Sequence, residues 1–130
     1  MPFYFDTSAL VKLLITEAES AALSAWLEAQ QPVAVTCDLT RTELQRAVKR
    51  RDPALLAQTR RLLDSFNVIA LMPSHFDDAG RRDPIHLRSL DAIHIVAALE
   101  LGDDLEGIVT YDDRMAEAAA LHGIAVIAPC

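Results

Sequence analysis

Residues 3–10 read FYFDTSAL, and this stretch is the starting point for interpreting the chain. Three aromatic residues that favour strands stop at Asp6, two hydroxyl residues follow, and apolar residues suited to a helix begin at Ala9. This order predicts a strand, a turn and a helix. In an open parallel sheet such a turn lies at the carboxyl end of a strand, where ligands bind, so Asp6 is a candidate site residue. Helix capping explains the same aspartate equally well.

Outward from this stretch, apolar runs alternate with helical patterns. Further strands are expected at residues 33–36, 68–71, 107–110 and 124–127, and helices at 9–15, 19–29, 39–52, 53–66, 75–79, 89–101 and 114–122. Ser89 is expected to cap a helix that is apolar nearly all round and therefore buried. The alternation predicts an α/β fold with a parallel sheet covered on both faces.

Composition narrows the class of protein. The 130 residues are 52% hydrophobic, which suits one domain over residues 1–130, and the net charge of −7 argues against binding nucleic acid by bulk electrostatics. Cys37 and Cys130 lie in no metal-binding or disulfide pattern, so a reducing cytoplasm is expected. No apolar run reaches the roughly 20 residues that cross a bilayer, and no signal peptide is evident.

Four acids occupy corresponding places along the chain. Asp6 ends the first strand, Glu43 lies in the first turns of the helix after the second, Asp91 opens the buried helix, and Asp112 follows the fourth strand. Strand ends and helix starts share one edge of a parallel sheet, so these carboxylates are expected to converge. Converging carboxylates repel one another unless cations neutralise them, and oxygen ligands select Mg²⁺ or Mn²⁺.

Each acid also has a purely structural explanation. Thr40 and Glu43 match a capping box, and Asp91 and Asp112 suit the positive ends of helix dipoles. Asp91 is the hardest to explain in this way, because it interrupts an apolar segment where an unpaired charge is costly. The residues by themselves leave the choice open.

Four motifs resemble the PIN-domain ribonucleases, specifically the VapC-type toxins of prokaryotic toxin–antitoxin pairs. They are FDTSAL (5–10), TRTEL (40–44), LRSLDAIHIVAALELG (87–102) and IVTYDDRMAEAAALHGIAVI (108–127). The resemblance runs the whole length of the chain, with the motifs in the family's order. It implies a three-layer α/β/α fold with a mainly parallel sheet of four to five strands, and a Mg²⁺- or Mn²⁺-dependent endoribonuclease.

The resemblance also implies roles for individual residues. Asp6, Glu43, Asp91 and Asp112 would form the acidic quartet that holds the ion, with supporting hydroxyls and a possible extra carboxylate at Thr7, Ser8, Thr110 and Asp113. His94 follows Asp91 by one helical turn, and we expect it to pack or to hydrogen-bond rather than to act as a base. Arg88 and Arg114 are candidates for RNA binding, although salt bridges at the surface explain them as well.

Partners follow from the resemblance too: a homodimer, an RNA substrate and a VapB-like antitoxin whose arginine could displace the cation. Apolar residues of the early helices suit either an antitoxin groove or ordinary core, namely Leu13, Leu14, Leu23 and Trp26. The basic segment 41–61 could steer RNA to the acidic site.

Two other functions compete with the nuclease. A non-catalytic module that binds RNA or antitoxin is disfavoured because all four acids are present. A phosphohydrolase with Asp6 as nucleophile, as in haloacid-dehalogenase-like enzymes, would need an acid where Ser8 stands. No P-loop or GxGxxG motif is present.

Overall fold

The computed structural model describes residues 1–130 and is built on a single sheet of five parallel strands. The strand order is β3-β2-β1-β4-β5. The strands are β1 (Pro2–Phe5), β2 (Val33–Cys37), β3 (Asn67–Ile69), β4 (Gly107–Val109) and β5 (Val126–Ile127). In register, Phe3 lies beside Ala34 of β2 and Gly107 of β4. The expectation of a parallel α/β sheet is confirmed.

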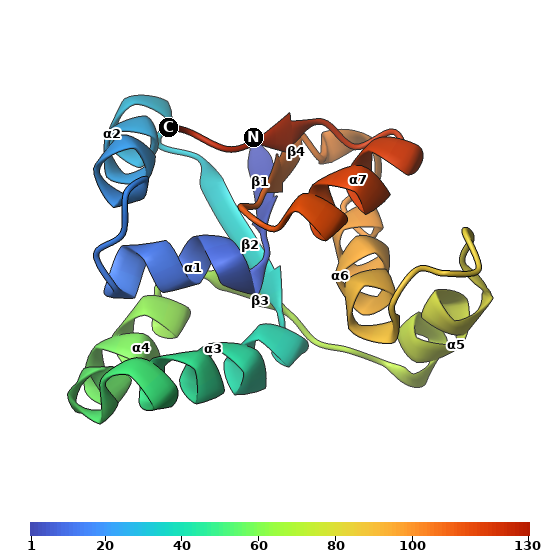
Figure 1. The fold of residues 1–130 in the computed structure, drawn as a ribbon. Coiled ribbons are helices and arrows are strands. Elements are labelled where there is room, and N and C mark those ends of the chain that lie inside the picture. Colours follow the sequence, from blue (N-terminus) through green and yellow to red (C-terminus); the bar gives the residue numbers. More distant parts are fainter.

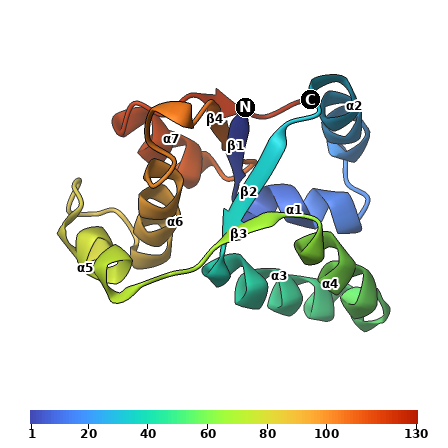
Figure 2. The same cartoon turned by 180° about the vertical axis from the view of Figure 1, so that it is seen from behind.

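Helices cover both faces of this sheet. They are α1 (Thr7–Leu14), α2 (Ser20–Gln30), α3 (Asp38–Arg51), α4 (Leu56–Asp64), α5 (Pro73–Arg81), α6 (Ser89–Leu99) and α7 (Asp113–Leu121). Figure 1 shows α1 to α4 on one side and α6 and α7 on the other. The view from behind shows α5 at the periphery, beside α6 (Figure 2). None of the helices is long and apolar enough to span a membrane.

The alternation of side chains along β1 divides the core in two. Phe3 and Phe5 face the cluster formed with α1 to α4, whereas Tyr4 faces the cluster formed with α6 and α7. Trp26 packs edge-to-face on Phe3, with ring centroids 5.0 Å apart. Leu23 is fully buried in the same cluster. Among the apolar residues considered for an antitoxin groove, Leu23 therefore belongs to the core, and Trp26, Leu13 and Leu14 are partly buried against it.

The sheet topology determines where a ligand can bind. From β1 the chain passes to β2 on one side and reaches β4 on the other, so the strand order changes direction beside β1. In open α/β sheets the crevice at the carboxyl ends of two such strands is the usual ligand site. Asp6 follows β1 directly at this point, and its N–H continues the ladder by donating to the Val109 carbonyl at 3.2 Å.

Two predictions about helix starts are wrong. Ser89 is the first residue of α6 and does not cap it, because the Arg88 carbonyl already accepts from the Ala92 N–H at 2.9 Å. α3 begins at Asp38, so Thr40 and Glu43 lie inside the helix and form no capping box. Their side chains are therefore available for contacts with other elements.

Helical structure between residues 53 and 66 is also shorter and less uniform than expected. A 3₁₀ turn, Pro53–Leu55, precedes α4, which ends at Asp64. Phe66 lies beyond the helix and packs edge-to-face on Phe5, with ring centroids 5.2 Å apart. The apolar periodicity predicts Phe66 on the helix, whereas Phe66 packs against the core from the turn that follows it.

Candidate active site

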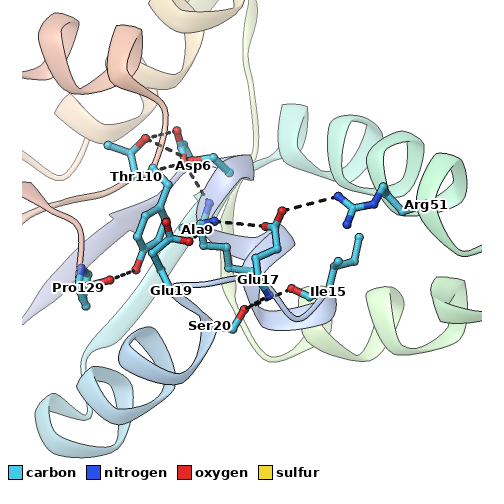
Figure 3. Close-up of polar contacts among 12 residues, drawn as sticks. Asp6, Ala9, Ile15, Glu17, Glu19, Ser20, Arg51, Thr110 and Pro129 are labelled. Atoms are coloured by element: carbon cyan, nitrogen blue, oxygen red, sulfur yellow. Dashed lines mark hydrogen bonds and ion pairs between the residues drawn. The ribbon is translucent and has the colours of Figure 1, made fainter.

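Asp6 is a buried carboxylate held by three donors. It is the N-cap of α1, and its Oδ1 accepts from the Ala9 N–H at 3.2 Å and from Ser8 Oγ at 2.6 Å. Its Oδ2 accepts from Thr110 Oγ1 at 2.6 Å, as Figure 3 shows. Burial raises the pKa of Asp6, although the hydroxyls of Ser8 and Thr110 act in the opposite direction. The capping role is confirmed, and the residue also lies at the crevice.

Thr110 connects this carboxylate to Asp112. Its Oγ1 donates to Asp6 and accepts from the Asp112 N–H at 3.1 Å. Asp112 in turn caps α7, since its Oδ1 accepts from the Arg114 N–H at 2.9 Å and from the Met115 N–H at 3.4 Å. Asp112 Oδ2 takes no hydrogen bond from the protein. Oδ1 of Asp112 thus caps α7, and Oδ2 remains available to a ligand.

Glu43 is held from two sides by a single oxygen. Its Oε1 accepts from Thr7 Oγ1 on α1 at 2.7 Å and lies 2.7 Å from His94 Nε2 on α6. Burial acts to raise the pKa of Glu43, but the hydrogen bonds from His94 and Thr7 outweigh it, so the pKa is lowered. Glu43 is therefore ionised over a wide pH range.

His94 connects this carboxylate to the central strand. Its side chain is almost fully buried, and its Nδ1 lies 2.7 Å from the Tyr4 hydroxyl and 4.0 Å from Cys37 Sγ. Burial alone would lower the pKa of His94, but its partners Cys37 and Glu43 raise it to about 10. His94 thus makes both the packing and the hydrogen-bonding contacts that the sequence predicts.

Asp91 contrasts with these partnered groups. It lies in the first turn of α6, half-buried, and makes no hydrogen bond with the protein. Burial raises its pKa, and the neighbouring Asp112 carboxylate raises it further, while Arg114, His94 and Arg88 act to lower it. Asp91 therefore lies beside a like charge and forms no hydrogen bond or ion pair with the arginines near it.

The predicted RNA-binding arginines lie close to Asp91. Arg88 and Arg114 are exposed, and both line a small pocket that also contains Asp91, together with Pro84, His86, Leu87, Glu117, Ala118 and Leu121. Asp113 is exposed on the first turn of α7 and makes no side-chain hydrogen bond. Of the residues considered at this edge, Asp113 is the least connected to the others.

An ionic cluster that sequence reasoning did not identify is centred on Lys12 of α1. Lys12 Nζ pairs with Glu19 at 2.8 Å and Glu17 at 3.3 Å, and lies 4.9 Å from the centroid of the Tyr111 ring. Glu17 also reaches Arg51 at 3.6 Å (Figure 3). These pairs tie the turn between α1 and α2 to α3 and to the segment after β4. A lysine in an otherwise apolar helical run was the only sequence signal.

Hydrogen bonds and charges thus link three pairs of groups at this edge: Asp6 with Asp112 through Thr110, Glu43 with His94, and Asp91 with Asp112. No three His, Cys, Asp or Glu side chains lie close enough together to hold a metal ion as they stand. Sequence reasoning also missed Tyr4 and Cys37, which contact His94. A tyrosine between two core phenylalanines was the available signal.

Comparison with known proteins agrees with this architecture. The family model for the PIN domain matches residues 3–121. Ribonuclease VapC46 of Mycobacterium tuberculosis is 42% identical over 126 residues, covering 97% of this chain and 96% of that protein. Ribonuclease VapC47 of the same species is 40% identical over 130 residues, with the same coverage.

Solved structures share the fold at lower identity. Mycobacterium tuberculosis VapC20, described as a sarcin-ricin loop cleaving toxin, superposes with a TM-score of 0.75 at 20% identity, covering 98% of this chain and 99% of that one. A toxin–antitoxin complex from Klebsiella pneumoniae gives a TM-score of 0.72 at 24% identity, covering 98% of each chain. The matched family model and the identities of 42% and 40% with the two ribonucleases show that the chain belongs to the PIN-domain family, among the VapC ribonucleases.

Proposed function

We propose that this chain is a divalent-metal-dependent endoribonuclease, the toxin of a toxin–antitoxin pair, which hydrolyses RNA phosphodiester bonds at the carboxyl edge of its sheet. The observation that carries the proposal is Asp91, a half-buried carboxylate with no protein partner beside the charge of Asp112. Such a pair is stabilised by a cation. Relatives named ribonucleases match nearly the whole chain and supply the reaction class.

The chemistry of the donors suits Mg²⁺ or Mn²⁺. Asp6, Glu43, Asp91 and Asp112 offer only carboxylate oxygens, which these hard cations prefer to nitrogen or sulfur. Asp91 and Asp112 retain oxygens that no protein group uses, and Asp91 can rotate without breaking a hydrogen bond. A bound divalent cation supplies positive charge at the scissile phosphate and lowers the pKa of water for hydrolysis.

The protein groups around the acids have distinct tasks in this proposal. Thr7, Ser8 and Thr110 orient the carboxylates of Asp6 and Glu43 through their hydroxyls. This orientation is set before substrate arrives, so little reorganisation is needed during the reaction. Asp113 remains a candidate for an additional ligand.

In this proposal Arg88 and Arg114 bind RNA phosphates beside Asp91. Both guanidinium groups line the pocket that contains this carboxylate, and a guanidinium can bind two phosphate oxygens at once. They offset the negative charge that the acids present to an anionic substrate. The basic segment 41–61 provides further positive potential at a distance, through exposed residues such as Arg41, Arg46 and Lys49.

A VapB-like antitoxin and a second copy of the chain complete the proposed assembly, within the cytoplasm. The Klebsiella pneumoniae neighbour was solved as a toxin–antitoxin complex, and a further neighbour with a TM-score of 0.66, FitAB, was solved on a DNA fragment. An arginine from the antitoxin could occupy the carboxylate site in place of the cation and so block it.

The test is cleavage of total cellular RNA by the purified, antitoxin-free chain with and without Mg²⁺ or Mn²⁺. Asp6→Asn and Asp91→Asn proteins serve as controls, and sequencing of new RNA ends locates the cuts. We expect discrete metal-dependent cuts that both variants lose while remaining folded. Equal cutting by the variants would reject the site, and absence of any cutting would favour the non-catalytic binding module.

A further inference from the structure

His94 is a buried titratable group near the proposed site to which the proposed reaction assigns no task. It is 3% exposed, lies on α6, and uses both ring nitrogens. We propose that His94, itself oriented by Tyr4, is a positioning residue that fixes the Glu43 carboxylate through Oε1 and so leaves Oε2 free to ligate the metal. The inference rests on the proposed metal-dependent function.

The first step of the argument is the direction of the hydrogen bond to Glu43. His94 Nε2 lies 2.7 Å from Glu43 Oε1, and a carboxylate can only accept, so Nε2 bears the proton. This holds for the neutral ring and for the imidazolium alike. In the neutral ring the Tyr4 hydroxyl donates to Nδ1, and in the imidazolium it accepts from Nδ1. The contact with Tyr4 is therefore compatible with donation to Glu43 in either state.

The second step is the rigidity of the anchor. Tyr4 is fully buried in the central strand β1, which pairs with β2 and β4 on its two sides. Its ring meets the His94 ring edge-to-face, with centroids 5.9 Å apart. The imidazole is thus fixed on the sheet by both a hydrogen bond and packing. Its contact with Glu43 in turn holds that side chain of α3 in place relative to the sheet.

The third step concerns which oxygen of Glu43 is restrained. His94 and Thr7 both contact Oε1, from α6 and from α1, while Oε2 has no hydrogen-bond partner in the protein. Two donors on one oxygen limit rotation of the carboxylate group. A carboxylate restrained through one oxygen presents the other in a defined direction, as metal ligands commonly require of their supporting residues.

The experiment compares His94→Leu with His94→Gln, whose amide can still donate at the position of Nε2. Tyr4→Phe removes only the anchoring hydroxyl, and Thr59→Val is the matched control, because the Thr59 hydroxyl is buried but bonds only the Leu55 carbonyl. Each protein is assayed for Mn²⁺ affinity by calorimetry, for thermal unfolding, and for kcat and KM on a cleaved RNA. His94→Leu is also combined with Glu43→Ala.

We expect His94→Leu to weaken Mn²⁺ binding and to lower kcat by about 10- to 100-fold, the range typical of groups that orient metal ligands. His94→Gln should recover most of this loss, Tyr4→Phe should show a smaller loss of the same kind, and Thr59→Val should lower the Tm alone. In the Glu43→Ala background, His94→Leu should lower neither Mn²⁺ affinity nor kcat any further, because His94 acts through Glu43.

Unchanged Mn²⁺ affinity in a folded His94→Leu protein would overturn the positioning role. So would a loss of Mn²⁺ affinity on His94→Leu that is as large in the Glu43→Ala background as in the wild type. If His94→Leu does not fold, Tyr4→Phe decides, and wild-type Mn²⁺ affinity in that variant counts against the role. A wild-type chain that binds Mn²⁺ but cuts no RNA would refute only the proposed nuclease function. A wild-type chain that binds no Mn²⁺ would refute both.

Discussion

Asp6 and Asp91 both lie in the group of acids at the carboxyl edge of the sheet, and both have a raised pKa, yet their surroundings differ. Asp6 is 3% exposed and accepts hydrogen bonds from two hydroxyls and a backbone N–H. Asp91 is half-buried and accepts none. Burial is the main cause of the raised pKa in both, but only Asp91 is also raised by another carboxylate, Asp112.

This difference indicates a division of labour. The Asp6 carboxylate is oriented before any ligand arrives, because its donors come from α1 and from the end of β4. Asp91 has no such support, so its orientation is determined by whatever binds it. In the proposed metal site Asp6 is therefore the preset ligand and Asp91 the adaptable one, and the two should respond differently to mutation.

The largest expected effect is from removing either carboxylate. Asp6→Ala and Asp91→Ala should each lower kcat/KM by about 10³-fold, which corresponds to about 4 kcal/mol of lost charge stabilisation at the reaction site. The free energy of unfolding without metal should separate them. Asp6→Ala should lose about 1–2 kcal/mol, because a helix cap and the acceptor of two hydroxyls disappear.

Asp91→Ala should not lower the free energy of unfolding at neutral pH, since it removes no hydrogen bond and takes away a charge that burial and Asp112 disfavour. Urea unfolding in the presence of a chelator measures both values, and RNA cleavage measures the rates. Equal destabilisation by the two substitutions would contradict the distinction between a preset and an adaptable ligand.

A smaller effect is expected from the hydroxyl that supports Asp6. Thr110→Val keeps the shape of the side chain but removes the donor to Asp6 and the acceptor for the Asp112 N–H. We expect a loss of about 10- to 100-fold in activity or Mn²⁺ affinity, and of about 1–2 kcal/mol in the free energy of unfolding. Calorimetric Mn²⁺ titration and urea unfolding test this, and unaltered Mn²⁺ binding would argue against support of Asp6 by Thr110.

The raised pKa values predict how metal binding and stability depend on pH. Mn²⁺ competes with protons for Asp6 and Asp91, so its affinity should fall as pH drops through their raised pKa values, by up to about tenfold per pH unit for each proton displaced. Calorimetric titration of Mn²⁺ over a pH series gives this slope. A Mn²⁺ affinity independent of pH across the acid range would contradict it.

In the metal-free protein a raised carboxyl pKa favours low pH, whereas Mn²⁺ binding favours high pH. A carboxyl whose pKa is raised by folding binds protons more tightly in the folded chain, so its contribution to stability is present at low pH and is lost as pH rises through the raised pKa. Metal-free Asp91→Asn protein should therefore become more stable than wild type at neutral pH and lose this advantage in acid. Urea unfolding at both pH values checks the sign.

The smallest expected effect concerns the arginine beside Asp91. Arg114 acts to lower the pKa of Asp91, so Arg114→Ala should raise that pKa further and move the pH dependence of Mn²⁺ binding to higher pH. It should also increase KM for RNA a few-fold and make KM depend less on salt, because the variant lacks an exposed charge whose contact with phosphate salt screens. Arg60→Ala, exposed on α4 and away from the Asp91 pocket, is the matched control. A shift in Mn²⁺ binding of the same size in both variants would contradict the local effect.

Local sequence chemistry predicted much of this structure, because residues close together in the chain indicate many of its helices and strands. The aromatic run before Asp6 became β1, and the apolar run after Asp91 became the buried helix α6. Helix starts were less predictable. Ser89 and Thr40 both have the residue type of a cap, but the N-caps of α6 and α3 lie earlier, at Arg88 and Cys37.

The sequence by itself determined the parallel α/β class, the positions of Asp6 and Asp112 directly before α1 and α7, and that of Asp91 in the first turn of α6, because these depend on periodicity and on residues close together in the chain. The tertiary structure alone decided the partners of each group. Tyr4 meets His94, His94 meets Glu43, and Thr110 meets Asp6, across separations of 51 to 104 residues. Such contacts depend on how helices pack on the sheet, and no local pattern specifies which oxygen is bound and which is left free.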